Sequence, residues 1–292
     1  MISFDDKAIS PMLIASEGEP FDDPAWQFEL KLDGERCLAW LCTEGTELRN
    51  KRHILLNPKV PELCKLHKQA CGQCILDGEL FVMQDGAPNF GLIQRRSLLS
   101  DPLKVQLHAR QHPATFCAFD VLLYNGKDLT NRPLHERRRV LEKAFHENER
   151  LALSRVVTGQ GAALFAQTKA RGLEGVVAKR LDSGYKPGVR TKDWLKIKNL
   201  LDDDFVILGV ERKEDGMSSL ALGQFDGGAL LPCGHVTLGV RRTEFGRIAR
   251  EPAGTLVCTV QFMARNARGG LRQPVFKGLR GDKAPEACVR RN

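Results

Sequence analysis

The chain has 292 residues, of which 42% are hydrophobic and 27% charged, and its formal net charge is +8. A chain of this length and hydrophobic content can bury a core, and it is longer than one small domain requires. No apolar run approaches the roughly 20 residues of a membrane-spanning helix, and residues 1–6 lack the parts of a signal peptide, which argues against membrane and secreted proteins. The nine cysteines are therefore expected to be reduced thiols of a cytoplasmic protein.

The first informative element is a predicted strand over residues 26–33. Apolar residues occupy its even positions, and polar or ionisable residues, Lys31 among them, occupy its odd positions, so the ionisable groups share one face. Gly34 then permits a sharp reversal of the chain. A lysine held among charged neighbours in this way can act as a covalent nucleophile. A salt-bridged lysine on an exposed amphipathic strand is the alternative.

A cluster of sulfur and imidazole ligands lies between the first two predicted strands. Cys64, His67, Cys71 and Cys74 fall within eleven residues and include a C-x-x-C spacing, which could close a zinc site. However, a predicted helix carries the first two of them, and Cys74 leads directly into the next strand. Little loop is left to wrap a metal ion, so we favour free thiols over zinc.

Three later segments add further charged groups to predicted strands. Residues 75–82 place Asp77 and Glu79 on one face. Residues 174–179 follow a helical stretch and a glycine. Glu174 and Lys179 have opposite parity, so a regular strand would point them to opposite faces. Either a bulge intervenes or Glu174 precedes the strand. Residues 194–198 place Lys196 and Lys198 side by side, an arrangement that a phosphate between them would satisfy.

The chain changes character near residue 200. Before it, short strands alternate with predicted helices over residues 61–70, 134–148 and 161–171. Residues 201–204 form a polar run that resembles a hinge. After it come short strands with glycine turns, over residues 205–210, 220–224, 235–240 and 255–263, a spacing that suggests a small all-β barrel.

Positive charge is concentrated in this C-terminal part. Residues 205–292 hold 14 Lys and Arg against 8 Asp and Glu, a net of +6, whereas residues 1–204 hold 30 against 28, a net of +2. A basic domain suits a polyanionic partner, because neutralising phosphates releases counterions and supplies most non-specific nucleic-acid affinity. A solvated charged surface is the alternative.

The motifs resemble those of ATP-dependent nucleotidyltransferases, the family of DNA ligases, RNA ligases and mRNA capping enzymes. Residues 31–36 match its K-x-D-G-x-R motif, and residues 77–79, 174–179 and 196–198 match its later motifs in order. Residues 11–13, 116–122, 134–138 and 271–283 are similar to the ligase module of bacterial end-joining ligase D and to small stand-alone bacterial and phage ligases.

The resemblance implies an α+β fold in two domains. Residues 1–200 would form a nucleotidyltransferase (adenylation) domain of antiparallel sheets with flanking helices, and residues 201–292 a small all-β OB-fold barrel. It also implies that Lys31 attacks ATP to form a lysyl-AMP, with Mg²⁺ or Mn²⁺ as the metal. The residues expected to bind ATP are Glu29, Leu30, Arg36, Glu79, Phe119, Lys179, Lys196, Lys198, Arg280 and Lys283. Glu79 and Glu174 would hold the metal, and Arg49 and Arg272 would contact DNA.

The implied function is an ATP-dependent DNA ligase that seals 5′-phosphate/3′-hydroxyl nicks in DNA repair and recombination. Its partners would be nicked double-stranded DNA and a Ku-like or other repair protein, with the ligase itself a monomer associated with the nucleoid. An RNA ligase or capping enzyme shares the Lys31 motif and is the closest alternative, although the tail over residues 271–283 resembles DNA ligases. A catalytically idle nucleic-acid-binding module would be expected to have lost Lys31.

Overall fold

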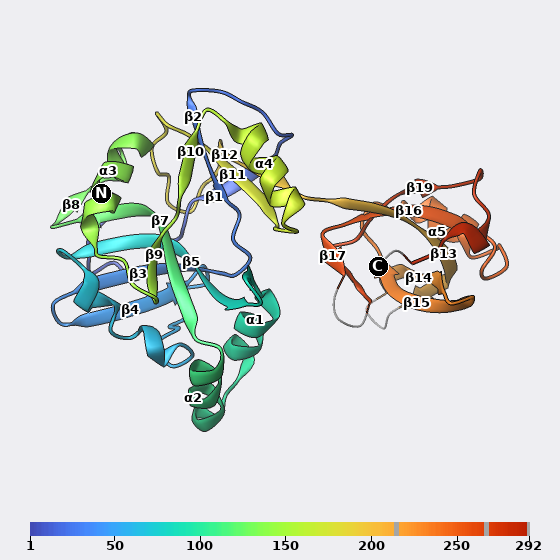
Figure 1. The fold of residues 1–292 in the computed structure, drawn as a ribbon, viewed down its shortest axis with the longest axis horizontal. Coiled ribbons are helices and arrows are strands. Elements are labelled where there is room, and N and C mark those ends of the chain that lie inside the picture. Colours follow the sequence, from blue (N-terminus) through green and yellow to red (C-terminus); the bar gives the residue numbers. More distant parts are fainter. Residues whose placement is uncertain (213–215, 266–268, 291–292) are drawn as a thin grey trace. The chain divides into compact units, whose positions relative to one another are not determined.

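The computed structural model describes residues 1–212, 216–265 and 269–290, and the chain forms two compact units, Met1–Lys198 and Asn199–Asn292 (Figure 1). Among the described residues, no helix is both long and apolar enough to cross a membrane.

The first unit is built from two sheets and four α-helices. Its strands are β1 (Leu13–Glu17), β2 (Trp26–Leu30), β3 (Glu35–Cys42), β4 (Gly45–Asn50), β5 (Cys74–Gln84), β6 (Ala87–Pro88), β7 (Ala114–Tyr124), β8 (Lys127–Asp128), β9 (Leu151–Leu153), β10 (Val156–Thr158), β11 (Gly175–Arg180) and β12 (Arg190–Lys198). Its helices are α1 (Phe90–Leu98), α2 (Pro102–Gln111), α3 (Leu134–Ala144) and α4 (Gly161–Ala170).

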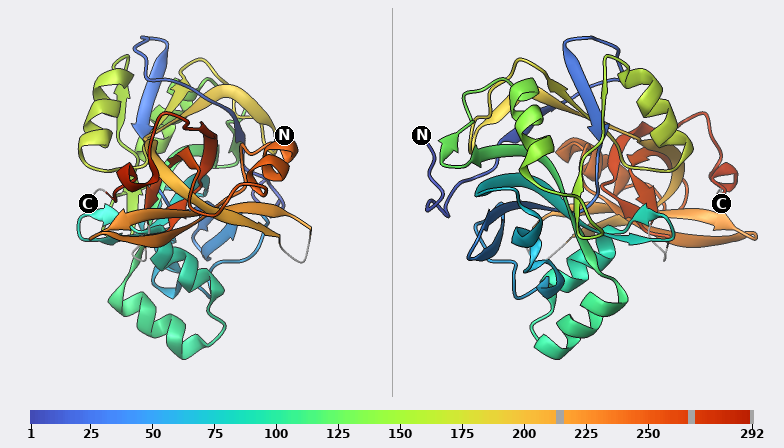
Figure 2. Two further views of the ribbon diagram at one scale, coloured as in Figure 1. Left: turned by 90° about the vertical axis from the view of Figure 1, so that its right-hand side faces the viewer. Right: turned by 60° about the vertical axis from the view of Figure 1, so that its left-hand side comes forward.

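One sheet has the order β1-β12-β11-β2-β10, and the other has the order β4-β3-β5-β7-β8, with β6 beside β5 and β9 beside β7. Most neighbours are antiparallel, as expected, but β1 pairs with β12 and β7 with β9 in parallel. Figure 2 shows in both views that α2, in green, extends away from these sheets, whereas α1 packs against the larger sheet, with Ile93 in the core.

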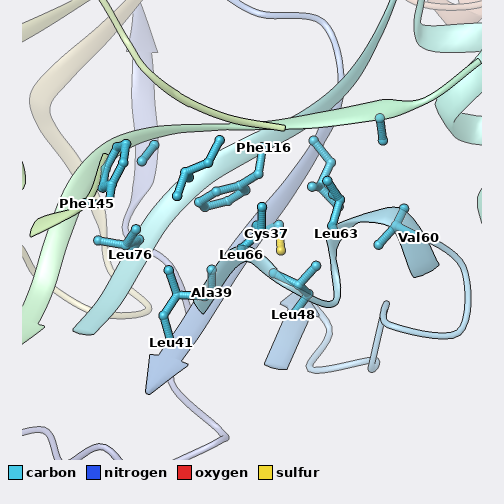
Figure 3. Close-up of a cluster of buried hydrophobic side chains, with 14 of the residues drawn as sticks. Cys37, Ala39, Leu41, Leu48, Val60, Leu63, Leu66, Leu76, Phe116 and Phe145 are labelled. Atoms are coloured by element: carbon cyan, nitrogen blue, oxygen red, sulfur yellow. The ribbon is translucent and has the colours of Figure 1, made fainter. Parts of the chain in front are cut away.

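The two sheets are held together because β3 buries both of its faces. Alternate residues Cys37, Ala39 and Leu41 point into a large cluster with Leu76 and Phe116 (Figure 3). The intervening Leu38 and Trp40 pack in a second cluster. That cluster also contains Trp194 of β12, so it joins the larger sheet to the smaller one. The ionisable motif residues of β2, β3, β5 and β11 therefore lie on packed, rigid strands.

The second unit contains a five-stranded sheet in the order β15-β14-β13-β16-β19 and a separate two-stranded sheet. Its elements are β13 (Leu201–Arg212), β14 (Ser218–Asp226), β15 (Ala229–Val236), α5 (Arg242–Ile248), β16 (Val257–Phe262), β17 (Ala264–Arg265), β18 (Leu271–Arg272) and β19 (Val275–Leu279). Gly227 and Gly228, at φ 57° and 86°, form a two-residue turn between β14 and β15. A bridge from Leu238 to Val275 joins the chain after β15 to β19, at the other edge of the sheet.

The polar run at 201–204, which its composition marked as hinge-like, lies in a paired strand. It is the beginning of β13, in which Leu201 pairs with Phe262 and Asp204 pairs with Thr259. Cross-strand pairing and ion pairs stabilise this run, whereas composition alone marked it as a linker. Only Asn199 and Leu200 separate β12 from β13.

Other expected elements differ in extent. The predicted helix over residues 61–70 is two short 3-10 helices, Pro61–Leu63 and Leu66–Gln69. The predicted strand over residues 235–240 is displaced, because β15 ends at Val236. The helices α1, α2 and α5 were not specifically predicted. In α1 the Asn89 side chain accepts a hydrogen bond from the N–H of Leu92 and caps the start of the helix.

Candidate active site

Lys31 directly follows β2 and extends its pairing with β11. Its backbone N–H donates to the carbonyl of Gly175 at 2.9 Å, and its Nζ forms an ion pair with Glu174 Oε1 at 2.6 Å. Glu174 precedes β11, which resolves the parity mismatch with Lys179 without a bulge between them. Glycine is required at 175, because φ is 137° and a Cβ would lie 2.1 Å from the carbonyl oxygen of Ile197.

A cavity of about 110 Å³ opens beside Lys31. Strands of both sheets supply its walls, so it lies where the two sheets face each other. Its lining residues are Ile14, Glu29, Leu30, Lys31, Leu32, Arg36, Glu79, Phe119, Ser154, Val177, Lys179 and Trp194. The structure therefore brings together eight of the residues expected at the site: Glu29, Leu30, Lys31, Arg36, Glu79, Phe119, Lys179 and, through its ion pair with Lys31, Glu174.

Glu29 and Lys179 form a buried ion pair at the wall of this cavity. Lys179 Nζ lies 2.8 Å from Glu29 Oε1, and the two side chains are 2% and 3% exposed. Gln27 donates to Glu29 Oε1 at 2.9 Å, and Ser154 donates to Oε2 at 2.8 Å. The Lys179 ammonium also lies 4.2 Å from the centre of the Phe119 ring, a cation–π contact. These contacts compensate two charges that burial would otherwise make costly.

Arg36 is held in one orientation by a buried carboxylate. Its Nε and Nη2 donate to the two oxygens of Asp77 at 2.6 and 2.5 Å. The Tyr185 hydroxyl donates to Asp77 Oδ2 at 2.6 Å, and it accepts a hydrogen bond from the N–H of Met12. Burial raises the pKa of Tyr185 well above its usual value, so the hydroxyl keeps the proton that it donates. The Arg36 guanidinium then faces Phe119, 4.5 Å from the ring centre.

Glu79 has the chemistry of a metal ligand. Burial raises its pKa to about 8, against the opposing effects of Arg36 and Lys31. A cation bound next to Glu79 would therefore favour the ionised form of its carboxyl group. No three His, Cys, Asp or Glu side chains within residues 1–212, 216–265 and 269–290 are grouped to hold a metal ion. Glu79 and Glu174 nevertheless fit Mg²⁺, which is commonly bound through one or two carboxylates, substrate phosphates and water.

Lys196 and Lys198 lie outside the cavity lining and already share an anion. Glu17 of β1 lies 3.3 Å from Lys196 Nζ and 2.7 Å from Lys198 Nζ. The hydrogen bond from Lys198 lowers the pKa of Glu17, so this carboxylate is ionised at neutral pH. The anion that the paired lysines required is thus a side chain of the protein, and Glu17 was not predicted from the sequence.

The residues expected to contact DNA are placed away from the cavity lining or in the second unit. Arg49 on β4 donates through Nε to Glu47 at 2.5 Å and through Nη1 to the carbonyl of His53 at 2.7 Å. Arg272 lies on β18 in the second unit. Arg280 and Lys283, which were expected to bind ATP and not DNA, follow β19 in the same unit.

The Cys64–Cys74 cluster is dispersed into separate environments. The Cys74 side chain is buried in the core, whereas Cys71 is exposed. The Nδ1 atom of His67 lies 3.0 Å from the hydroxyl of Thr46, and Cys64 lies beside Asn57.

Two residues that orient the site were not predicted from the sequence. Ser154 hydrogen-bonds Glu29 from 125 positions along the chain, and Tyr185 hydrogen-bonds Asp77 from 108 positions away. Neither belongs to one of the predicted motifs. Only the tertiary fold brings them to the site, so no local signal could have identified them.

The buried ion pair generates a stability prediction. Glu29→Gln leaves the Lys179 charge buried without its counter-ion and should lower the free energy of unfolding by about 3–5 kcal/mol, measured by urea denaturation. The double variant Glu29→Gln/Lys179→Met should recover part of this loss. Asp182→Asn, which breaks an exposed pair with Arg180, is the control and should change stability little. Equal losses in Glu29→Gln and Asp182→Asn would contradict the assigned role of the buried pair.

Comparison with known proteins identifies relatives that match most of the chain. The chain is 31% identical over 296 residues to the multifunctional non-homologous end joining protein LigD of Mycobacterium bovis, covering 91% of this chain and 37% of that protein. It is 28% identical to the SPbeta prophage-derived DNA ligase-like protein LigB of Bacillus subtilis, covering 93% of this chain and 99% of that protein. This chain thus spans well under half the length of the LigD proteins and nearly all of LigB.

A solved structure of mycobacterial DNA ligase D complexed with ATP and MES matches with a TM-score of 0.61 and 28% identity, covering 98% of this chain and 100% of that one. The family model of the ATP dependent DNA ligase domain matches residues 11–198, which include the cavity and Lys31. The resemblance predicted from the motifs is confirmed. This chain belongs to the family of ATP-dependent DNA ligases.

Proposed function

We propose that this protein is an ATP-dependent DNA ligase that seals nicks between a 5′-phosphate and a 3′-hydroxyl in DNA repair. The observation that carries the proposal is the position of Lys31, at a cavity formed by strands of the family's domain. Lys31 pairs with Glu174 at 2.6 Å, and two further buried networks fix the residues around it.

In the first step, Lys31 Nζ attacks the α-phosphorus of ATP. A phosphorus–nitrogen bond forms, the bond to pyrophosphate breaks, and one proton of the ammonium must leave before the attack. In the second step, an oxygen of the nick 5′-phosphate attacks the phosphorus of the lysyl-AMP, the phosphorus–nitrogen bond breaks, and the lysine recovers a proton. In the third step, the 3′-hydroxyl loses its proton and attacks that 5′-phosphate, the phosphodiester bond forms, and the phosphoanhydride bond breaks to release AMP.

The cavity supplies the groups for binding the nucleotide. The Glu29 carboxylate would accept a hydrogen bond from the adenine amino group, with Leu30 beside it and Phe119 stacked on the base. A carboxylate has about four acceptor positions. Gln27 and Ser154 each donate one hydrogen bond to Glu29, and Lys179 forms an ion pair with it, so acceptor capacity remains on the carboxylate for the base. Arg36, oriented by Asp77, would bind the ribose.

Charge neutralisation is the main requirement of phosphoryl transfer. Lys196 and Lys198 would contribute positive charge on β12, where Glu17 keeps them side by side. Glu79 and Glu174 would hold Mg²⁺, which would neutralise phosphate charge when bound. Arg280 and Lys283 of the tail would contact the β- and γ-phosphates during the first step only, because the departing pyrophosphate removes their ligand.

DNA would be held by both units. We propose that the second unit is an OB-fold, a fold used widely for binding nucleic acid. Its five-stranded sheet, the bridge between Leu238 and Val275, and its excess of basic residues support this assignment. Arg272 and, in the first unit, Arg49 would contact the DNA backbone. A Ku-like end-binding protein is the proposed recruiting partner.

One experiment separates this proposal from the alternatives within the family. The protein is incubated with ATP labelled at the α-phosphate and with Mg²⁺, then chased with nicked DNA, nicked RNA and capping acceptors in parallel. The label should become attached to the protein and should then be transferred from the protein to nicked DNA. Transfer only to RNA or to a capping acceptor would contradict the DNA ligase proposal, and an unlabelled protein would contradict nucleotidyl transfer altogether.

Lys31→Ala should abolish labelling of the protein while leaving its fold intact. The Lys31 side chain is 21% exposed and forms an ion pair with Glu174, so its removal should affect the reaction and not the fold. Circular dichroism should match that of the wild type, and autoradiography should show no adenylylated band. Lys143→Ala, on exposed α3 surface, serves as the control and should label fully. A labelled Lys31→Ala protein would identify another nucleophile.

Nick binding should weaken steeply with salt, because dispersed Lys and Arg contacts to phosphates release counterions. The two-residue turn between β14 and β15 offers no insertion that could encircle the duplex. Nick affinity measured from low to moderate salt should fall along a steep log–log line. Arg272→Ala should reduce its slope by about one. A nearly flat dependence would rule out this mode of binding.

Lys283→Ala should affect the steps of the reaction unequally. Formation of lysyl-AMP should slow by about a hundredfold, because the leaving pyrophosphate loses a stabilising charge. Sealing of a nick that is supplied already adenylylated should be retained, because no pyrophosphate is present in that step. Both activities can be assayed on one preparation. Equal losses in the two assays would assign Lys283 to DNA binding or folding instead.

A further inference from the structure

Asp203 and Asp204, near the beginning of β13, are adjacent residues whose carboxylates point to opposite faces of the strand. Asp203 Oδ2 accepts hydrogen bonds from Gln224 Nε2 at 2.9 Å and Arg265 Nη2 at 3.0 Å. Asp204 has different partners, although the two side chains are almost equally buried, at 16% and 13% exposed. The backbone N–H of Asp204 also donates to Asp203 Oδ1 at 2.9 Å, and asparagine at position 203 retains this acceptor. The side-chain contacts of the two carboxylates can therefore be tested separately.

Asp204 is fixed by its neighbour across the sheet. Thr259 of β16, its direct pairing partner, donates a hydrogen bond to Asp204 Oδ1 at 2.6 Å. This contact sets the rotamer of the carboxylate, so that its second oxygen has a defined position. Although burial would raise the pKa of Asp204, hydrogen bonds from Lys283 and Thr259 lower it, and the carboxylate stays ionised.

The second oxygen of Asp204 binds both cations of the tail. Lys283 Nζ lies 2.8 Å from Asp204 Oδ2, and Arg280 Nη1 lies 3.3 Å from the same atom. The tail reaches this point because β19 pairs with β16, with Leu279 opposite Cys258. The Arg280 and Lys283 side chains are 39% and 22% exposed, so both remain accessible to a ligand.

We propose that Asp204 is a positioning residue for the first step of the reaction, which holds Arg280 and Lys283 together as one binding site for the β- and γ-phosphates of ATP. This inference rests on the proposed function, in which the tail meets those phosphates. It adds a residue that is remote in sequence from the tail and makes no contact with substrate itself.

Two properties of the arrangement support the proposal. Two cations brought close together repel each other, and a carboxylate between them offsets that repulsion before ATP arrives. An arginine has five N–H donors and a lysine has three, more than the contacts to Asp204 and Asp282 consume. The free donors of both side chains can therefore bind phosphate oxygens while Asp204 keeps its place.

The test compares Asp204→Asn with Asp203→Asn. Asp204→Asn removes the charge with little change of shape, and it should slow single-turnover formation of lysyl-AMP by about tenfold or more, because the two cations lose their common anchor. Sealing of an already adenylylated nick should stay at the wild-type rate. Asp203→Asn disturbs an equally buried carboxylate on the same strand and should leave both rates close to wild type.

A third variant tests whether Asp204 acts through the tail. Adding Asp204→Asn to Lys283→Ala should slow lysyl-AMP formation by less than the product of the two single effects. The inference would be overturned if Asp204→Asn formed lysyl-AMP at the wild-type rate or faster. It would also be overturned if the effects of Asp204→Asn and Lys283→Ala multiplied fully, or if Asp204→Asn slowed lysyl-AMP formation and nick sealing equally. The inference would also fail if Asp203→Asn slowed lysyl-AMP formation as much as Asp204→Asn does. If the wild-type protein itself takes no label, the proposed function fails, and the inference fails with it.

Discussion

The pairing of β2 with β11 is the constraint on which the site depends. Leu30, the last residue of β2, lies opposite Val176 in this antiparallel ladder, and Lys31 follows it directly. The same register brings Glu174 to the Lys31 ammonium and Lys179 to the carboxylate of Glu29. A slip of either strand by one residue would turn its side chains to the opposite face of the sheet, away from their partners on the other strand. The buried sides of both strands exclude such a slip, so the register and the site are specified together.

A second theme is that the protein supplies an anion for each group of cations expected to meet phosphate. Glu174 pairs with Lys31, Glu17 with the two lysines of β12, and Asp204 with the two cations of the tail. In the latter two places, a shared carboxylate allows like charges to lie close together before a ligand is present. Electrostatic preorganisation of this kind avoids the cost of rearranging charged groups during phosphoryl transfer.

Sequence reasoning located the parts of the site that lie in local motifs. Alternation over residues 26–33 identified the strand that leads to Lys31, and the segment 174–179 identified its partner, because period-two patterns and glycines are local signals. The strand at 201–204 was not predicted, since its pairing with β16 depends on residues far along the chain. Ser154 and Tyr185 were not predicted for the same reason: each reaches the site only through tertiary contacts.

The central claim is that the register of β2 and β11 makes Lys31 the acceptor of AMP. Tandem mass spectrometry of peptides from the ATP-treated protein tests this claim most directly, because it locates the nucleotide on a single side chain. The account predicts AMP on the peptide that contains Lys31, attached to that lysine. AMP attached to another residue, including Lys179, Lys196 or Lys198, would contradict it.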